Sequence, residues 1–314
     1  MKKIKISVVT ATFNEEANIE KISNDIADEM KKLDVDYEHI IIDNDSTDKT
    51  QFIIREICKK DKKIKAIFNS RNFGHTRSPY YAILQSSGDA TILLAADFQD
   101  PIELIPSLIN KWQIGYKVVF LKRKNSEENL ITETIKRIFY RFINLISEIE
   151  LVEKTTGSGI FDKAIISELK KLEDPNPYFR GMISEIESNI GIIEFQQPKR
   201  LYGKSKNNLY SLFDLGVNGI IKHSKLPLRI MTIGGFIFSL ILIIVGLFFL
   251  IYKILYWDKF QLGLAPVILG VFFGISILIF MLGVIGEYIA IILNQVRKIP
   301  LVVEKERINF DKIL

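Results

Sequence analysis

Short hydrophobic runs recur through the first part of the chain and alternate with longer amphipathic segments. Five runs rich in apolar and β-branched residues are predicted to form strands, over residues 4–12, 37–43, 64–69, 90–96 and 117–122. Between them, segments such as Glu15 to Leu33 and Thr47 to Lys60 carry apolar residues at helical spacing. This alternation is typical of an α/β domain built on a mostly parallel sheet.

The last third of the chain contains two long uncharged stretches. Met231 to Tyr252 has no charged residue, and as a helix rising about 1.5 Å per residue it would span about 33 Å, the thickness of a bilayer core. Leu262 to Gly286 is also uncharged, and the connection between the two carries Tyr and Trp residues that suit a membrane interface. The pattern predicts a transmembrane hairpin. The alternative, two buried helices of a soluble core, is less favoured because such helices normally keep a polar face.

Basic residues are distributed unequally around the predicted hairpin. Seven lie outside it and two lie in its loop: Lys222, Lys225, Arg229, Arg297, Lys298, Lys305 and Arg307, against Lys253 and Lys259. Because positive charge is enriched on the cytoplasmic side of membrane proteins, both ends of the hairpin are expected to face the cytoplasm.

The pattern divides the chain into four predicted parts. These are an α/β domain over 1–208, an interfacial amphipathic segment over 209–229, the two membrane helices within 230–294, and a cytosolic C-terminal tail over 295–314. The second part mixes apolar residues with Asp214, Lys222 and Lys225, which suits a helix lying on the headgroups until Pro227 ends it. An ordinary core helix of the α/β domain is the alternative.

The composition of the chain excludes few classes of binding partner. The chain has 314 residues, 48% of them hydrophobic, and a net charge of +5. That charge suits an anionic membrane face, a phosphorylated substrate or nucleic acid, and does not choose among them. The single cysteine, Cys58, excludes an internal disulfide.

Polar side chains cluster where the predicted strands end. The strand ends are followed by Asn14-Glu15-Glu16, Asp43-Asn44-Asp45-Ser46, Asn69 to Gly74, Asp97-Phe98-Gln99-Asp100 and Lys122-Arg123-Lys124. Ligands of parallel sheets bind beyond the carboxyl ends of the strands, so these clusters predict a site for a metal and phosphates. The alternative for any single cluster is a set of turn and cap residues. Neither the dinucleotide fingerprint GxGxxG after the first strand nor the P-loop motif is present.

The stretch TILLAADFQDP, residues 91–101, predicts the metal site itself. Asp97 and Gln99 fall on the same side of an extended chain, and Mg²⁺ or Mn²⁺ prefers a few such oxygens completed by substrate phosphates.

Taken in order, these motifs resemble a known family. TATFNEE, IIDNDSTDKT, NFG, SSGDATILLAADFQDP, GSGIFDK, PYFRG and RLYGKSKNN are similar to the polyprenyl-phosphate glycosyltransferases of glycosyltransferase family 2, and the resemblance covers essentially the whole chain. It implies a GT-A (Rossmann-like) fold and an inverting transfer from a nucleotide sugar, expected to be a UDP-sugar, to a polyprenyl phosphate such as undecaprenyl phosphate. It also implies a divalent cation, no nucleic-acid partner, and a multi-pass protein of the bacterial inner membrane with its catalytic domain in the cytoplasm.

The resemblance implies particular donor and metal residues. Asp43 matches the first acid of the family's DDGS segment, which contacts the base, and Asn44-Asp45 stand where the family usually has Asp-Gly. Asp97 and Gln99 match the metal ligands of DADLQDP, whose leading acid is replaced by Ala95. The expected donor-binding residues are Thr12, Asn14, Glu15, Asp43, Asp45, Asn72, Gly74 and His75.

Phosphate binding is assigned to basic residues. Arg123 and Arg200 match phosphate-binding arginines of the family, and further acceptor-phosphate candidates are Arg141, Lys204, Ser205 and Lys206. The alternative for residues 200–206 is a solvated basic loop or a contact with anionic headgroups. Asp162 matches a family acid near the sugar, with a helix N-cap as its alternative. The predicted catalytic set is Asp97, Arg123, Asp162 and Arg200.

Two other functions remain open from sequence. A processive polysaccharide synthase is less favoured, because no QxxRW segment is present and two membrane helices are too few for a polymer channel. A non-catalytic membrane scaffold is motivated by Ala95 and Asn44. Small residues such as Gly234 and Gly235 support close helix packing and a homo-oligomer.

Overall fold

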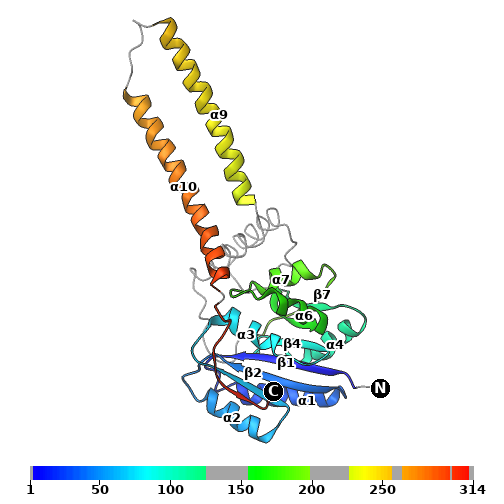
Figure 1. The fold of residues 1–314 in the computed structure, drawn as a ribbon. Coiled ribbons are helices and arrows are strands. Elements are labelled where there is room, and N and C mark those ends of the chain that lie inside the picture. The colour runs from blue at the N-terminus through cyan, green and yellow to red at the C-terminus, as the bar shows by residue number, and fades with distance from the viewer. Residues whose placement is uncertain (1–2, 125–154, 199–225, 257–263, 298, 311–314) are drawn as a thin grey trace.

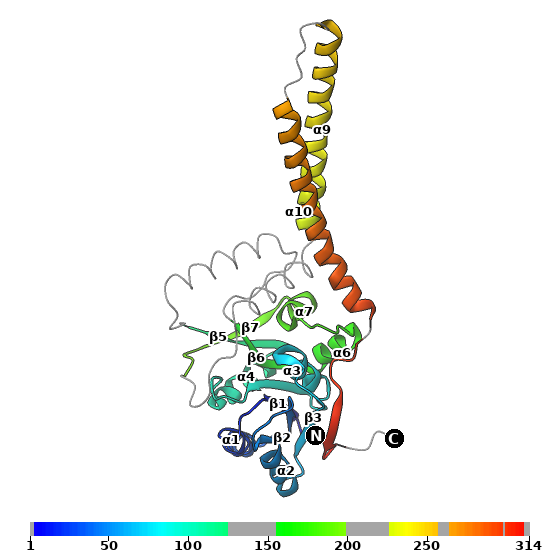
Figure 2. The same cartoon turned by 90° about the vertical axis from the view of Figure 1, so that its left-hand side faces the viewer.

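The computed structural model of the protein describes residues 3–124, 155–198, 226–256, 264–297 and 299–310. An α/β domain carries two long helices that project away from it (Figures 1 and 2).

One mixed sheet forms the centre of the domain. Its strands, in the order in which they lie, are β7 (Ile190–Phe195), β5 (Val118–Arg123), β6 (Thr155–Asp162), β4 (Ala90–Ala95), β1 (Lys5–Thr12), β2 (Asp36–Asp43), β3 (Ile64–Asn69) and β8 (Glu304–Ile308). β6 and β8 run antiparallel to their neighbours, and the other strands run parallel to one another. The five predicted strands are confirmed, each within one residue at either end.

β8 is the largest departure from the predicted organisation. Residues 304–308 belong to the predicted C-terminal tail, but they pair with the edge strand β3, with Ala66 opposite Ile308 and Phe68 opposite Glu306. Their sequence, EKERI, has the charge expected of an exposed edge strand and lacks the apolar run that marks a central one. The chain beyond the apolar helices therefore returns to the sheet.

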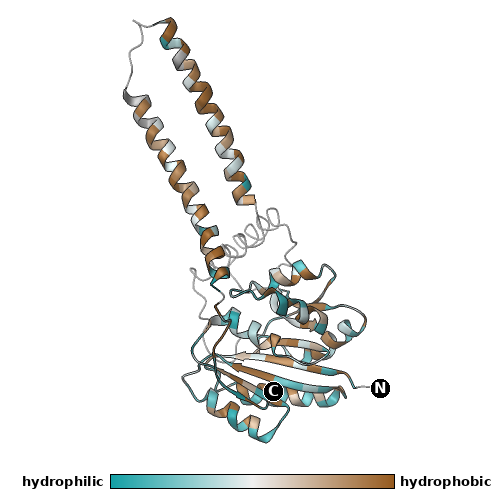
Figure 3. Cartoon of the chain, in the orientation of Figure 1, coloured by the Kyte–Doolittle hydropathy of each residue, from teal (hydrophilic) through white to brown (hydrophobic). Residues whose placement is uncertain are grey.

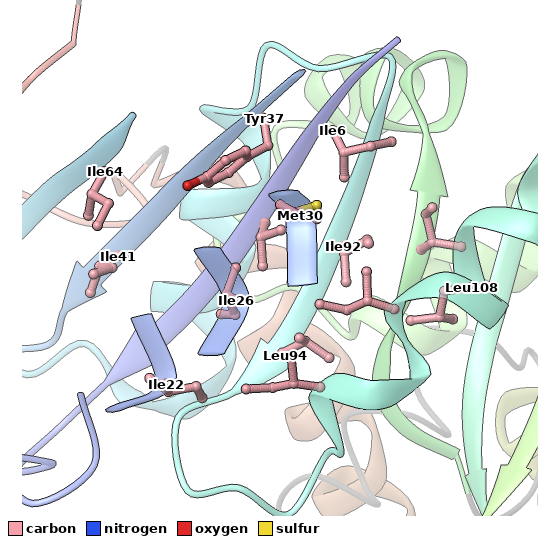
Figure 4. Close-up of a cluster of buried hydrophobic side chains, with 14 of the residues drawn as sticks. Ile6, Ile22, Ile26, Met30, Tyr37, Ile41, Ile64, Ile92, Leu94 and Leu108 are labelled. Atoms are coloured by element: carbon pink, nitrogen blue, oxygen red, sulfur yellow. The ribbon is translucent and has the colours of Figure 1, made fainter. Parts of the chain in front are cut away.

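Helices cover both faces of the sheet. α1 (Ile19–Lys32), α2 (Thr50–Lys60) and α4 (Ile105–Gln113), the last preceded by the short helix Ile102–Leu104, pack on one face, and α3 (Gly74–Leu84), α6 (Lys163–Leu172) and α7 (Phe179–Ile186) on the other. In α1, Ile22, Ile26 and Met30 recur at helical spacing and are fully buried against the sheet (Figure 4). Each such side chain contributes about 1.5–3 kcal/mol by leaving water.

The two apolar helices are α9 (Leu226–Leu255) and α10 (Leu264–Val296). Leu228–Leu255 and Gly270–Val296 are long and apolar enough to cross a membrane, and no part of their most apolar stretches is buried within the protein. They form an antiparallel hairpin with a hydrophobic surface (Figure 3), and the rings of Phe238 and Phe273 lie 6.2 Å apart between them.

The helix limits differ in detail from the predicted ones. α10 continues past Gly286 to Val296, and Pro227 lies in the first turn of α9, a position that tolerates proline. The rest of the predicted interfacial segment, 209–225, lies outside the described residues.

Candidate active site at the carboxyl edge of the sheet

The strand order places a topological switch point at the carboxyl ends of three central strands. β1 lies between β2 and β4, with Thr12 opposite Asp43 on one side and Ala11 opposite Ala95 on the other. The chain leaves β1 toward β2 and later returns on its other side as β4, which is the switch point where ligands of open α/β sheets bind. The predicted polar clusters after β1, β2 and β4 therefore meet at one edge.

The loops after β1 and β2 are bonded into one unit. Asn14 adopts a left-handed conformation (φ 58°), which asparagine tolerates better than most residues. Its backbone N–H donates to Ser46 Oγ (2.8 Å) and its Oδ1 accepts from Thr47 N (2.8 Å). The Glu15 N–H donates to Thr50 Oγ1 (2.9 Å). These bonds fix two of the predicted donor-binding loops relative to each other.

Asp43 is a fully buried carboxylate at the base of this unit. Its Oδ2 accepts from Ser46 N (3.0 Å) and Gln51 Nε2 (2.8 Å), and its Oδ1 accepts from Thr12 Oγ1 (3.4 Å). Asp45 follows in a left-handed conformation (φ 65°). Asp43 thus orders the loop that shapes the predicted base pocket.

Asn44 joins this unit to the loop after β3. Its Oδ1 accepts from Asn69 Nδ2 (3.0 Å) and from Phe73 N (2.9 Å), while its Nδ2 donates to Asn72 Oδ1 (2.8 Å) and Gly74 O (3.2 Å). A carboxylate could accept the first pair but could not donate the second. Sequence reasoning treated Asn44 only as a departure from the family pattern; the recurrence of asparagines after β2 and β3 was the signal for this junction.

Gly74 and His75 begin α3 beside this junction. Gly74 has a left-handed φ of 89°, which only glycine adopts without cost, and its N–H donates to Asn72 Oδ1 (2.8 Å). His75 and Asn72 are exposed at the carboxyl edge. The structure thus groups Asn72, Gly74 and His75 with Asn14 and Asp43.

Asp97 follows β4 at the same edge. It is 6% exposed, and its Oδ1 accepts from Gln99 N (3.1 Å). The extended chain assumed from sequence is wrong, because Phe98 between them is left-handed (φ 57°) and the chain turns. The Lys21 ammonium lies 4.6 Å from the centre of the Phe98 ring, so α1 supports the turn.

Asp100, which the sequence placed in the polar cluster after β4 without a role of its own, is buried. Its Oδ2 accepts from Ala95 N (3.1 Å) and Ser158 Oγ (2.5 Å), which ties the turn to β4 and β6. Burial raises the pKa of Asp100, the bonds from Ser158 and Ala95 oppose the rise, and smaller charge effects come from Asp97 and Arg123.

Arg123 ends β5, which is separated from β4 in the sheet by β6. Its Nε is buried and has no hydrogen-bond partner among the described residues. A buried guanidinium donor without a partner is costly, and a phosphate oxygen could accept its hydrogen bond. The role of Arg123 as a phosphate ligand stays a prediction.

The residues present fit a divalent cation that is shared with a substrate. Within the described ranges, no group of three or more His, Cys, Asp or Glu side chains could hold a metal ion. Mg²⁺ and Mn²⁺ are commonly held by one or two carboxylates and complete their shells with phosphates and water. Asp97, with Gln99 beside it, suits that mode of binding.

Comparison with known proteins identifies the family. Residues 7–170 match the model described as Glycosyl transferase family 2. The chain belongs to this family. Among its relatives, an uncharacterized glycosyltransferase of Bacillus subtilis (strain 168), YkcC, is 30% identical over 95% of this chain and 92% of its own length. A bactoprenol glucosyl transferase of Shigella phage SfX is 29% identical over 97% of this chain and 100% of its own length.

A solved structure supports the fold. Glucosyl-3-phosphoglycerate synthase from Mycobacterium tuberculosis, crystallised with Mn²⁺, UDP-glucose and phosphoglyceric acid, has a TM-score of 0.50 and 20% identity over 69% of this chain and 78% of its own. At this identity the likeness concerns the fold alone, and it agrees with the GT-A architecture.

In this glycosyltransferase Asp162 lies away from the candidate site. It pairs opposite Ala90 at the start of β4, about five residues, or roughly 17 Å, from the edge that carries Asp97. Its Oδ1 accepts from Ala164 N (2.8 Å) as the N-cap of α6, and its Oδ2 accepts from Trp112 Nε1 (2.8 Å). The N-cap alternative is confirmed, and the predicted role near the sugar is wrong for this geometry.

The remaining basic candidates are placed only in part. Arg141, Arg200, Lys204, Ser205 and Lys206 lie outside the described residues, so their roles stay predictions. Arg180 in α7 was not selected from sequence, although it lies in the PYFRG motif. Its guanidinium donates to Thr155 O (3.1 Å), and Thr155 pairs opposite Lys122, next to Arg123. Arg180 thus adds a second arginine near this edge.

Proposed function

We propose that this family 2 glycosyltransferase moves a sugar from a UDP-sugar to a polyprenyl phosphate, such as undecaprenyl phosphate. The transfer takes place on the cytoplasmic face of a bacterial inner membrane, which α9 and α10 cross as a hairpin. Relatives named bactoprenol glucosyl transferase match this chain over nearly its full length, including the apolar helices, which supports the acceptor class. The UDP-glucose bound to glucosyl-3-phosphoglycerate synthase supports the donor class.

The observation that carries the proposal is the buried Nε of Arg123, which has no hydrogen-bond partner among the described residues, on a side chain whose charge favours ionisation of Asp100. Both substrates bring phosphate to one place, since the donor carries a diphosphate and the acceptor a monophosphate. Arginine binds such oxygens with good geometry. Arg123 is assigned to these phosphates together with Arg141, Arg200, Lys204, Ser205 and Lys206.

The donor lies along the carboxyl edge in this proposal. The unit formed by the loops after β1 and β2 holds the nucleoside through Thr12, Asn14, Glu15, Asp43 and Asp45. The loop after β3 approaches it with Asn72, Gly74 and His75. The bonds of Asn44 keep these loops in register before the donor arrives, which lowers the cost of binding.

The reaction follows from these positions. An oxygen of the lipid phosphate attacks the anomeric carbon, the bond from that carbon to the diphosphate breaks, and the nucleoside diphosphate leaves with the electron pair, inverting the configuration. The lipid phosphate is already ionised near pH 7, so no strong general base is needed. Arg123 holds phosphate oxygens in line. Mg²⁺ or Mn²⁺ held by Asp97 and Gln99 would stabilise negative charge on the leaving diphosphate.

A transfer assay tests the proposal. Detergent-purified full chain is incubated with undecaprenyl phosphate, Mg²⁺ or Mn²⁺ and a panel of radiolabelled UDP- and GDP-sugars, and the products are extracted into organic solvent. We expect label from one UDP-sugar in the lipid phase as a lipid-linked monosaccharide. Label in a polymer would indicate a polysaccharide synthase instead. No label from any donor, with the chain folded and an active relative working in the same assay, would favour a scaffold.

A further inference from the structure

Two arginines flank the start of α3 outside the residues assigned above. The guanidinium carbon of Arg71 lies 4.2 Å, and that of Arg77 5.6 Å, from the centre of the Phe73 ring. Phe73 is 8% exposed, so its ring is a fixed platform for both cations. Burial lowers the pKa of Arg77, and the charge of Arg71 lowers it further, which indicates that the two cations repel each other.

No acidic side chain neutralises this pair within the described part of the chain. Arg71 donates only a long bond to Asn72 O (3.4 Å), Arg77 donates to Pro300 O, and the buried Nε of Arg77 has no partner there. Two other arginines of the domain are paired with acids: Arg55 with Glu306 (2.8 Å) and Arg307 with Glu304 (2.6 Å). Two adjacent cations with spare donors favour an anion.

The pair also lies close to the membrane helices. Pro300 is four residues beyond Val296, the end of α10, and four residues of chain reach at most about 14 Å. Ser70 N donates to Val303 O (2.8 Å), which ties the same loop to the chain leaving α10. α3 lies on the side of the sheet from which the apolar helices project (Figures 1 and 2).

We propose that Arg71 and Arg77 bind the phosphate of an anionic phospholipid headgroup and so hold the glycosyltransferase domain against the bilayer. Guanidinium groups suit phosphate oxygens, and basic groups near an anionic membrane surface are attracted to it. The donor diphosphate offers the same chemistry, but the bond from Arg77 to the chain leaving α10 favours the lipid source. The proposal concerns binding and does not depend on which sugar is transferred.

Ligand binding by the full chain in an uncharged detergent tests this inference. Dihexanoylphosphatidylglycerol, dihexanoylphosphatidylcholine and UDP are titrated into the wild type, into Arg71→Gln/Arg77→Gln and into Lys59→Gln/Lys60→Gln. The last variant loses the same charge at the end of α2, on the opposite face of the sheet. We expect the arginine variant to bind the phosphatidylglycerol at least about tenfold more weakly, from two lost phosphate contacts. UDP binding stays unchanged, and the lysine variant behaves like the wild type.

Three results would overturn the inference. In the first, the arginine variant binds the phosphatidylglycerol as tightly as the wild type does. In the second, it binds UDP more weakly but binds the lipid normally. In the third, its affinity for the phosphatidylcholine falls as much as its affinity for the phosphatidylglycerol. The second would assign the pair to the donor diphosphate. If the double variant fails to fold, Arg71→Gln alone decides, because Arg71 is exposed and must show part of the same loss. If the wild type binds no UDP, that result counts against the proposed function. The lipid affinities of the wild type and the two variants still test the role of Arg71 and Arg77.

Discussion

At the scale of single residues, Asn44 shows how one side chain can organise a site. It is 6% exposed and uses both ends of its amide, accepting from Asn69 and Phe73 and donating to Asn72 and Gly74. Each bond made by a buried group contributes about 1 kcal/mol, and an unmade one costs more. The loop after β3 therefore depends on a side chain at position 44 that can both accept and donate hydrogen bonds.

Changing Asn44 to aspartate tests this dependence. In Asn44→Asp a carboxylate oxygen replaces the donor that faces Asn72 Oδ1 and Gly74 O, so the loop should separate from β2. We expect a thermal midpoint several degrees lower and UDP binding weaker by about tenfold or more. Asn110→Asp, the same change at an exposed position of α4, is the control. Unchanged UDP affinity and stability in Asn44→Asp would show that the junction does not matter.

Asp162 is a single residue whose substitution should leave sugar transfer almost unchanged. Asn in its place can still accept one of the two bonds from Ala164 N and Trp112 Nε1, so Asp162→Asn should lose about 1 kcal/mol of stability. Sugar transfer should continue at close to the wild-type rate, because the side chain lies far from Asp97. The measurement is a melting curve together with the transfer assay. A folded Asp162→Asn protein that transfers no sugar would return Asp162 to the catalytic set.

At the scale of elements, the amino end of the sheet is held by a buried ionic cluster. Glu38 of β2 is 2% exposed and accepts from Ser7 Oγ (2.6 Å) and Ser87 N (2.8 Å), with Lys65 Nζ at 2.7 Å. Burial opposes ionisation of Glu38, but the bonds from Lys65, Ser7 and Ser87 outweigh it and lower the pKa to about 2. The cluster joins β1, β2 and β3 opposite the candidate site.

The lowered pKa predicts an acid-sensitive fold. Because the folded-state pKa lies below the ordinary value of about 4.5, Glu38 stabilises the domain fully above that pH and loses its contribution as the pH falls toward 2. Glu38→Gln should lower the melting temperature at pH 7, and its difference from the wild type should shrink below about pH 4.5. Glu20→Gln, on the exposed face of α1, is the control. A constant difference from pH 7 to pH 3 would contradict this role.

The elements also show what the sequence could and could not predict. Central parallel strands such as β1 and β2 were predictable because they are buried on both faces and read as apolar runs. β6 was missed because Gly157 and Ser158 interrupt its pattern, and β8 because its charged residues suit an exposed edge. The grouping of Asp43 with Asp97 followed from parallel strands ending at one edge. Asp162 was assigned near the sugar by the family resemblance alone, and the structure shows it at the end of the antiparallel strand β6, opposite the start of β4.

At the scale of the whole molecule, the membrane helices and the candidate site form one structure. After α10 the chain pairs as β8 with β3, where Glu306 bonds to Arg55 and Asn309 donates to the carbonyls of Cys58 and Ile64. The carboxyl end of β3 leads into the loop that Asn44 holds. The apolar hairpin is thus fixed to the same strand that presents part of the proposed donor site, which suits an enzyme whose acceptor lies in the membrane.

In the proposed function the carboxyl edge of the sheet, with Asp97 as a metal ligand, transfers sugar to a lipid phosphate. Its most direct test is lipid extraction after reaction of the full chain with its preferred UDP-sugar, undecaprenyl phosphate and Mg²⁺ or Mn²⁺, with and without chelator. Asp97→Asn is compared with Asp28→Asn, on the exposed face of α1. We predict labelled lipid from the wild type and Asp28→Asn, and none from Asp97→Asn or with chelator. Full transfer by a folded Asp97→Asn protein would contradict the account.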